Sequence, residues 1–142
     1  MMSGLDVFDK AVEKSEGWLK DIMYELMWNE QHKAYLALRA TLHSLRDRLT
    51  LEEVTDLGAQ LPMLIRGLYY EGWNPSKTPV KVRDKEEYLS MIGEHFQNDP
   101  AVDPEKVARA VFKLLSHRIT EGEIQDIKQV LPKEIEELWP QM

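Results

Sequence analysis

The sequence predicts an all-α protein composed of two tandem copies of a roughly 70-residue helical unit. Residues 39–69 align without a gap on residues 109–139, and eleven of these 31 pairs are identical. A repeat of fixed period is typical of a duplicated supersecondary unit. Apolar residues also recur at helical spacing in both copies, and no segment is predicted to be a strand. The identical pairs are Arg39/Arg109, Ala40/Ala110, Leu45/Leu115, Arg48/Arg118, Thr50/Thr120, Glu53/Glu123, Asp56/Asp126, Leu61/Leu131, Pro62/Pro132, Ile65/Ile135 and Leu68/Leu138.

The length of 142 residues is that of one domain, and we expect residues 1–142 to form a single compact domain. The copies cover about residues 5–73 and 84–140, and a linker over 71–83 joins them. Each copy is predicted to contain three main helices followed by a short helix that begins at a proline. Because each helix has one apolar face, we expect the copies to pack through a shared core about a pseudo-two-fold axis.

The first two helices of the first copy are predicted from apolar periodicity. Apolar residues at positions 5, 8, 12, 19, 22, 23 and 26 indicate a helix over about residues 5–28. Either Ser3 or Asp6 can cap its start. A second helix is predicted over about residues 32–46.

A capping box occurs once in each copy. Thr50 is followed by Glu53, and Thr120 is followed by Glu123. In this motif the threonine hydroxyl accepts the backbone N–H three residues on, and the glutamate bonds back to the threonine N–H. We therefore predict helix caps at these four residues. Each helix is short because a proline lies twelve residues after the threonine and opens the next helix. These prolines are Pro62 and Pro132.

The linker and the start of the second copy are marked by turn residues. Residues 71–83 contain a glycine, two prolines and an Asn-Pro step, which favour a connection over a helix. The second copy is predicted to reopen at Asp84, with a helix to about Phe96. Asp103 is predicted to cap a helix that runs through Ser116. Cations around the linker are interpreted as solvated; they are Lys77, Lys81, Arg83 and Lys85.

Composition excludes several classes of function. The formal charge of −7 argues against broad nucleic-acid binding and against docking on an anionic membrane. There is no cysteine, which excludes disulfides and thiolate zinc sites. No stretch approaches the length of a membrane span, and the first residues do not resemble a signal peptide. We therefore expect a soluble cytoplasmic protein.

The repeated charged residues are interpreted first as structural. Arg39 and Arg109 lie in the middle of predicted helices, and Asp56 and Asp126 lie one element later. Ion pairs from Arg39 to Asp56 and from Arg109 to Asp126 would join helices within each copy. The alternative is that the two arginines bind an anion.

Aromatic residues end both copies. Tyr69, Tyr70 and Trp73 close the first copy, and Trp139 closes the second. They are interpreted as core residues that cover the boundary between the copies. The alternative is a partner groove or a ligand pocket, because tyrosine and tryptophan are enriched at binding surfaces.

Sequence motifs for catalysis are lacking. There is no nucleophile elbow, phosphate-binding loop or dinucleotide fingerprint. The four histidines do not follow glutamates at the spacing of a di-iron bundle. We therefore expect no catalytic residue, cofactor or metal site, although a metal site assembled from distant helices stays open.

Two segments resemble a known family. ALRATLHSLRDRLTLEEVTDLGAQLPMLIRGLYYEGWNP, residues 37–75, and ARAVFKLLSHRITEGEIQDIKQVLPKEIEELWP, residues 108–140, resemble the bacterial Domain of Unknown Function 2267 family. The resemblance covers nearly all of the chain beyond the first dozen residues. It implies a compact all-helical tandem-repeat protein with no established activity and no catalytic residues to transfer.

Three hypotheses for function follow. The leading hypothesis is a non-enzymatic helical protein that binds a protein partner or forms a homodimer. The second is a small-ligand or anion-binding domain whose pocket lies between the copies, lined by Tyr69, Tyr70, Trp73, Arg39 and Arg109. The third is a metal-dependent enzyme that uses carboxylates and histidines from different helices.

Overall fold

A computed structural model describes residues 4–82 and 84–141, and all regular structure in these residues is helical. Ser3 and Arg83, predicted as a helix cap and a linker cation, lie outside the described residues. The α-helices are α1 (Asp6–Leu26), α2 (Gln31–Arg46), α3 (Leu51–Gln60), α4 (Met63–Tyr70), α5 (Lys85–Gly93), α6 (Pro104–Arg118), α7 (Glu121–Val130) and α8 (Lys133–Glu136). The 3-10 turns are η1 (Pro75–Lys77) and η2 (Glu94–Phe96).

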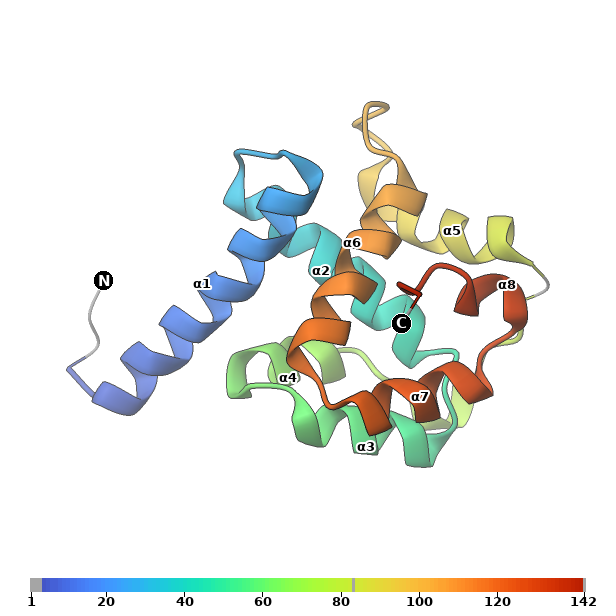
Figure 1. Ribbon diagram of the computed structural model, residues 1–142, viewed down its shortest axis with the longest axis horizontal. Coiled ribbons are helices and arrows are strands. Elements are labelled where there is room, and N and C mark those ends of the chain that lie inside the picture. Colours follow the sequence, from blue (N-terminus) through green and yellow to red (C-terminus); the bar gives the residue numbers. More distant parts are fainter. Residues whose placement is uncertain (1–3, 83, 142) are drawn as a thin grey trace.

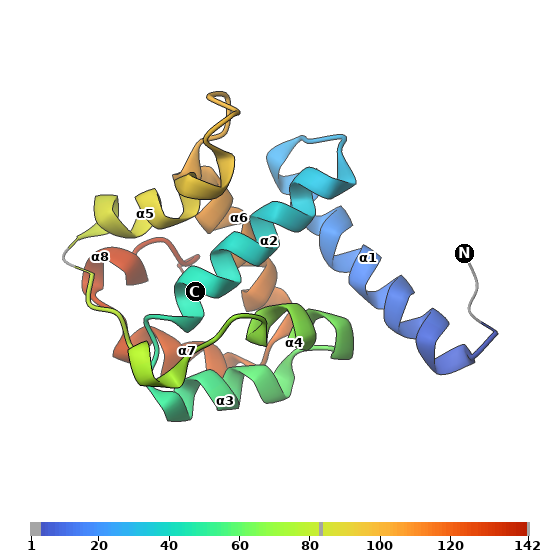
Figure 2. The ribbon, with the colours of Figure 1, turned by 180° about the vertical axis from the view of Figure 1, so that it is seen from behind.

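Helices α2 and α6 form the centre of the molecule (Figures 1 and 2). They pack against each other and against both α1 and α5, and α2 also contacts α4. Their sequences place apolar side chains on several faces, so that Leu38, Leu42 and Phe112 are fully buried. Phe112 stacks on Trp139 with ring centroids 4.2 Å apart, which fastens the end of the chain to α6. The core is therefore shared by the two halves of the chain.

Helix starts follow the predicted capping residues. The side chains of Thr50, Asp84, Asp103 and Thr120 each accept a backbone N–H from the first turn of the following helix. These bonds satisfy N–H groups that lack a partner within the helix. Prolines stand at the N-cap positions of α4 and α8, as the proline positions in the sequence predict. Helix α1 begins after Leu5 without a side-chain cap.

Helix α1 projects beyond the body of the protein (Figures 1 and 2). Its C-terminal half packs on α2, α4 and α6 through buried Trp18 and Ile22. Its N-terminal half extends outward, and the large apolar residues there are exposed. The helix ends at Leu26, and the next residue, Met27, adopts a left-handed conformation with φ of 57°. One helix thus serves both the core and the surface.

The connection between the halves follows the surface of the body. After α4 the described residues contain only the short turn η1 before α5 begins. The backbone N–H of Val80 donates to the carbonyl of Asp47 over 2.6 Å, and the Val82 side chain is buried. The connection is therefore attached to the end of α2. No helix among the described residues is both long and apolar enough to cross a membrane.

Candidate functional site

The repeated arginines do not form the predicted ion pairs. Arg39 pairs with Glu71 over 2.8 Å, and Arg109 pairs with Glu105 on its own helix over 2.8 Å. Helix α3 packs on α4 and α7. The predicted partners, Asp56 and Asp126, are instead solvent-exposed residues of α3 and α7.

The aromatic residues at the end of α4 form a packed cluster. Tyr69 is fully buried, and its hydroxyl donates to the carbonyl of Val54 over 2.7 Å. Burial raises the pKa of Tyr69 far above its usual range. Tyr70 and Trp73 are partly buried, and the Tyr70 ring contacts both neighbours. Tyr69 therefore belongs to the core, which corrects the alternative in which it lines an open pocket with the arginines.

The two capping boxes form only in part. The hydroxyls of Thr50 and Thr120 accept the N–H groups of Glu53 and Glu123, each over 3.4 Å. The return bond to Thr120 comes from another residue, because the Thr120 N–H donates to Gln60 Oε1 over 3.0 Å. Gln60 also donates its Nε2 to the Thr120 hydroxyl over 3.0 Å. This double contact joins the end of α3 to the start of α7 and leaves the Glu123 carboxylate without its capping role.

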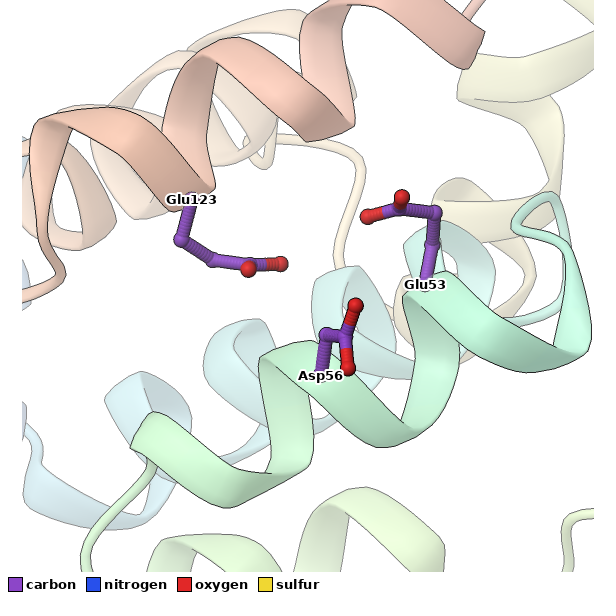
Figure 3. A group of neighbouring side chains, drawn as sticks. All are labelled: Glu53, Asp56 and Glu123. Atoms are coloured by element: carbon purple, nitrogen blue, oxygen red, sulfur yellow. The ribbon is translucent and has the colours of Figure 1, made fainter.

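Three carboxylates converge where α3 and α7 pack side by side. Figure 3 shows Glu53 and Asp56 on α3 directed toward Glu123 on α7. One ligand oxygen from each side chain lies within 4.8 Å of the others. Glu123 is buried, Glu53 is partly buried and Asp56 is exposed, so the cluster has one face open to solvent. The Oε2 atoms of Glu53 and Glu123 are both buried without a hydrogen-bond partner.

The cluster holds its carboxyl groups at raised pKa values. Burial, then the charges of Glu53, Asp56 and Asp126, raise the pKa of Glu123 from 4.5 to about 7. Burial and the charges of Asp56, Asp126 and Glu52 raise the pKa of Glu53 in the same way. A carboxylate removed from water and placed beside like charges favours its neutral form. A proton or a cation would therefore relieve the repulsion in this cluster.

Comparison with models of protein families identifies the family of the chain. A family model described as "Uncharacterized conserved protein (DUF2267)" matches residues 15–138. The chain belongs to the DUF2267 family. The resemblance inferred from residues 37–75 and 108–140 is thus confirmed. No curated protein matches the chain. Membership of DUF2267 adds no functional residue to those that the geometry brings together.

Sequence reasoning missed the carboxylate cluster in this DUF2267 member. In the sequence alone, Glu53 and Glu123 match the pattern of helix caps, and Asp56 matches the partner of an ion pair. The available signal was the identity of both acidic positions in the two copies, Glu53/Glu123 and Asp56/Asp126. The repeated acidic positions do not show which face of each helix meets the other copy. The contact between α3 and α7 in the structure supplies that information.

A second feature is the apolar face of α1. Leu5, Phe8 and Val12 are 55%, 50% and 41% exposed and lie at helical spacing on one stripe. The stripe continues through Ser15 and Leu19 into an apolar cleft of about 240 Å³. Side chains of α2 and α4 form the rest of that cleft; they are Tyr35, Leu38, Leu64, Ile65 and Leu68.

A larger cleft of about 480 Å³ lies between the end of α1, helix α6 and the C-terminal residues. Lys106, Arg109 and Lys113 line it from successive turns of α6. Two of these cations already have partners, because Arg109 pairs with Glu105 and Lys113 pairs with Glu25. Of the two arginines predicted to bind an anion, Arg109 thus lines this cleft, whereas Arg39 lies on α2 and pairs with Glu71.

Proposed function

We propose that the chain is a non-enzymatic association module that forms a homodimer through the apolar stripe of α1. The observation that carries the proposal is the projecting half of α1, which exposes Leu5, Phe8 and Val12 on one face. Contiguous exposed apolar surface of this kind marks interaction sites in soluble proteins. The occupant to which we commit is a second copy of the same chain.

The projecting half is an addition to the packed helical unit. In the sequence repeat Glu16 and Trp18 align with Glu86 and Tyr88, so the packed part of α1 corresponds to α5. Helix α1 has 21 residues and α5 has nine. Residues 6–14 thus have no counterpart in α5, and they also precede the family match, which starts at residue 15. A helical extension that the core does not use is available for association.

The same chain offers a ridge and a receiving cleft. The ridge carries Phe8 and Val12, and the cleft is formed by α1, α2 and α4 around Leu64 and Leu68. The residues from 6 to 16 contain neither glycine nor proline, so the ridge continues as one helix and does not bend back into its own cleft. In a two-fold dimer each ridge would enter the cleft of the other copy, which is the self-complementary geometry of an isologous interface.

The test is the mass of the full chain in solution. We expect light scattering after size exclusion to give twice 16.6 kDa for the wild type. Phe8→Gln, which removes a 50% exposed ring from the stripe, is expected to shift the mass toward the monomer. Val7→Gln is the matched control, because Val7 is 57% exposed in the same turn but about 100° away around the helix. A wild type that stays monomeric at high concentration would reject the proposal.

We also infer that the two halves arose from one duplicated unit arranged about a pseudo-two-fold axis. The eleven identical pairs support this inference. So do the equivalent hydroxyl caps at Thr50 and Thr120, and the prolines that precede α4 and α8.

A second candidate function is anion binding, and the cleft on α6 favours it. Lys106, Arg109 and Lys113 present three cations to one cleft beside Trp139. A small acidic ligand would displace Glu105 and Glu25 from their present ion pairs. Titration with inorganic phosphate, compared between wild type and Lys106→Gln, tests this candidate. If the wild type does not bind phosphate, the anion-binding candidate is rejected and the association module is the one candidate function left.

A further inference from the structure

We propose that Glu53, Asp56 and Glu123 form a binding site for a hard divalent cation between α3 and α7. The three side chains converge from two helices that are far apart in the sequence (Figure 3). All potential ligand atoms are carboxylate oxygens, without histidine or cysteine. Such a donor set suits Ca²⁺, Mg²⁺ or Mn²⁺ and is a poor choice for zinc.

The spacing of the oxygens fits a cation of this size. Their mutual distances do not exceed 4.8 Å. Ca²⁺ binds oxygen at about 2.3–2.6 Å, so two ligands on opposite sides of the ion are separated by roughly 4.6–5.2 Å. Mg²⁺ binds at about 2.0–2.1 Å, so two ligands on opposite sides of that ion are separated by roughly 4.0–4.2 Å. The oxygens are therefore close enough together for one cation of either kind to contact all three carboxylates after side-chain adjustment.

Glu123 is the observation that distinguishes this cluster from an ordinary acidic surface. Its side chain is only 7% exposed, it points toward Glu53 and Asp56, and its Oε2 atom has no hydrogen-bond partner. The capping role that would use this carboxylate is taken by Gln60, which accepts the Thr120 N–H. A buried unpaired carboxylate is costly unless something satisfies it.

No cationic side chain in the part of the chain that the structure describes forms an ion pair with the cluster. Among the described residues the ion pairs involve other carboxylates, and none includes Glu53, Asp56 or Glu123. A bound divalent cation would offset the three like charges and satisfy both buried Oε2 atoms. Exposed Asp56 leaves one side open, so that solvent can reach the ion and water can complete its coordination.

The competing explanation is a proton shared between Glu53 and Glu123. At acidic pH this proton would satisfy the same oxygens. The pKa of Glu123 is about 7, so the two explanations predict different behaviour above pH 7, where the proton is lost. Under those conditions a proton-only cluster repels itself, whereas a cation site reaches its highest affinity because its ligands are ionised.

The experiment is calorimetric titration of the chelator-treated full chain with CaCl₂ and, separately, MgCl₂, above pH 7. Thermal unfolding is followed with and without each salt, and NaCl at matched ionic strength controls for screening. We expect one cation per chain and a rise in Tm. Glu123→Gln is expected to lose at least about tenfold in affinity, since even outer-shell changes at metal sites cost 10–100-fold.

Glu121→Gln is the matched control. Glu121 lies in the same first turn of α7, is exposed, and lies outside the cluster. It is expected to bind the cation as the wild type does. If Glu123→Gln does not fold by circular dichroism, Glu53→Gln replaces it. The proposal is overturned if the wild type shows neither binding heat nor a Tm shift with either salt. It is equally overturned if the cluster variant binds as tightly as the wild type.

Discussion

Replacing Glu123 by glutamine should change how the stability of the protein depends on pH. In the unfolded chain the Glu123 carboxyl ionises near 4.5, whereas in the folded protein its pKa is about 7. Between these values the folded state binds more protons than the unfolded state. The stabilisation is therefore complete below pH 4.5 and is lost as the pH rises through 7. Glutamine does not ionise, so the variant lacks this loss.

The magnitude follows from the two pKa values. Each pKa unit corresponds to about 1.4 kcal/mol, so a rise from 4.5 to about 7 corresponds to at most about 3.4 kcal/mol of stability. Asp56 and Asp126 are exposed, and water and salt screen their share, which lowers the expected effect to about 1–3 kcal/mol. In a domain of this length 1 kcal/mol moves Tm by roughly 3–5 °C.

The comparison between variants isolates this effect. Glu53 has a raised pKa and contributes in the same direction, whereas burial lowers the pKa of His43 and makes stability rise with pH up to about 6.5. Carboxyls with lowered pKa values, Glu71 and Glu105, act only below about pH 4.5. The contributions of His43, Glu71 and Glu105 are present in wild type and variant alike, and they largely cancel when the difference between the two proteins is compared at two pH values. Glu53 lies in the same cluster as Glu123, so its response is part of the effect of the substitution.

The assay is urea unfolding at about pH 5 and about pH 8 in the presence of a chelator, with Glu121→Gln as control. The Glu123→Gln variant should gain stability relative to wild type by about 1–3 kcal/mol more at the higher pH than at the lower. Equal differences at both pH values would refute the reasoning. They would mean that the Glu123 carboxyl is not destabilised in the folded protein.

Three further predictions concern local geometry and use the same unfolding assay. Gly58→Ala should destabilise the protein by about 1–3 kcal/mol, because the added Cβ would lie 2.7 Å from Tyr70 Cζ. Gly67→Ala has open space around the added Cβ and should stabilise the protein by roughly 0.5–1 kcal/mol. A change of the same sign in both variants would contradict this account. Met27→Gly should raise the free energy of unfolding by about 0.5–1 kcal/mol, since φ of 57° suits glycine, and an unchanged value would argue against strain. Thr120→Ala should lower the free energy of unfolding by about 1 kcal/mol or more, because the Thr120 hydroxyl both caps α7 and accepts a hydrogen bond from Gln60 Nε2. An unchanged free energy of unfolding would mean that the cap does not contribute to stability.

Local sequence signals predicted the helices well because their causes are local. A hydroxyl or carboxylate followed by a helical run specifies a start, and Thr50, Asp84 and Thr120 each cap the helix that follows. The proline at position 62 sets the boundary between α3 and α4 for the same reason. The all-helical class is thereby confirmed. The length of α1 was also predictable, since its apolar stripe runs from residue 5 to residue 26.

Contacts between distant side chains were not predictable in the same way. Arg39 and Asp56 are 17 positions apart, and whether they meet depends on the direction in which α3 leaves α2. That direction is set by packing of α3 on α4 and α7. Glu71, the partner that Arg39 has, lies beyond the end of α4. Periodicity identifies which residues share a helix face, but it does not state which helix that face will meet.

The carboxylate cluster shows how a locally favourable choice becomes unfavourable after packing. A glutamate in the first turn suits the positive end of a helix, so Glu53 and Glu123 each favour their own helix start. Packing α3 against α7 brings these carboxylates together with Asp56 in a partly dry space. Conflicts between local and global structure are expected at functional sites. A proton resolves this one only while the pH stays below about 7, and a divalent cation resolves it above. The two remedies predict different responses to CaCl₂ at alkaline pH: a cation site would regain the lost stability, and a proton-only cluster would not.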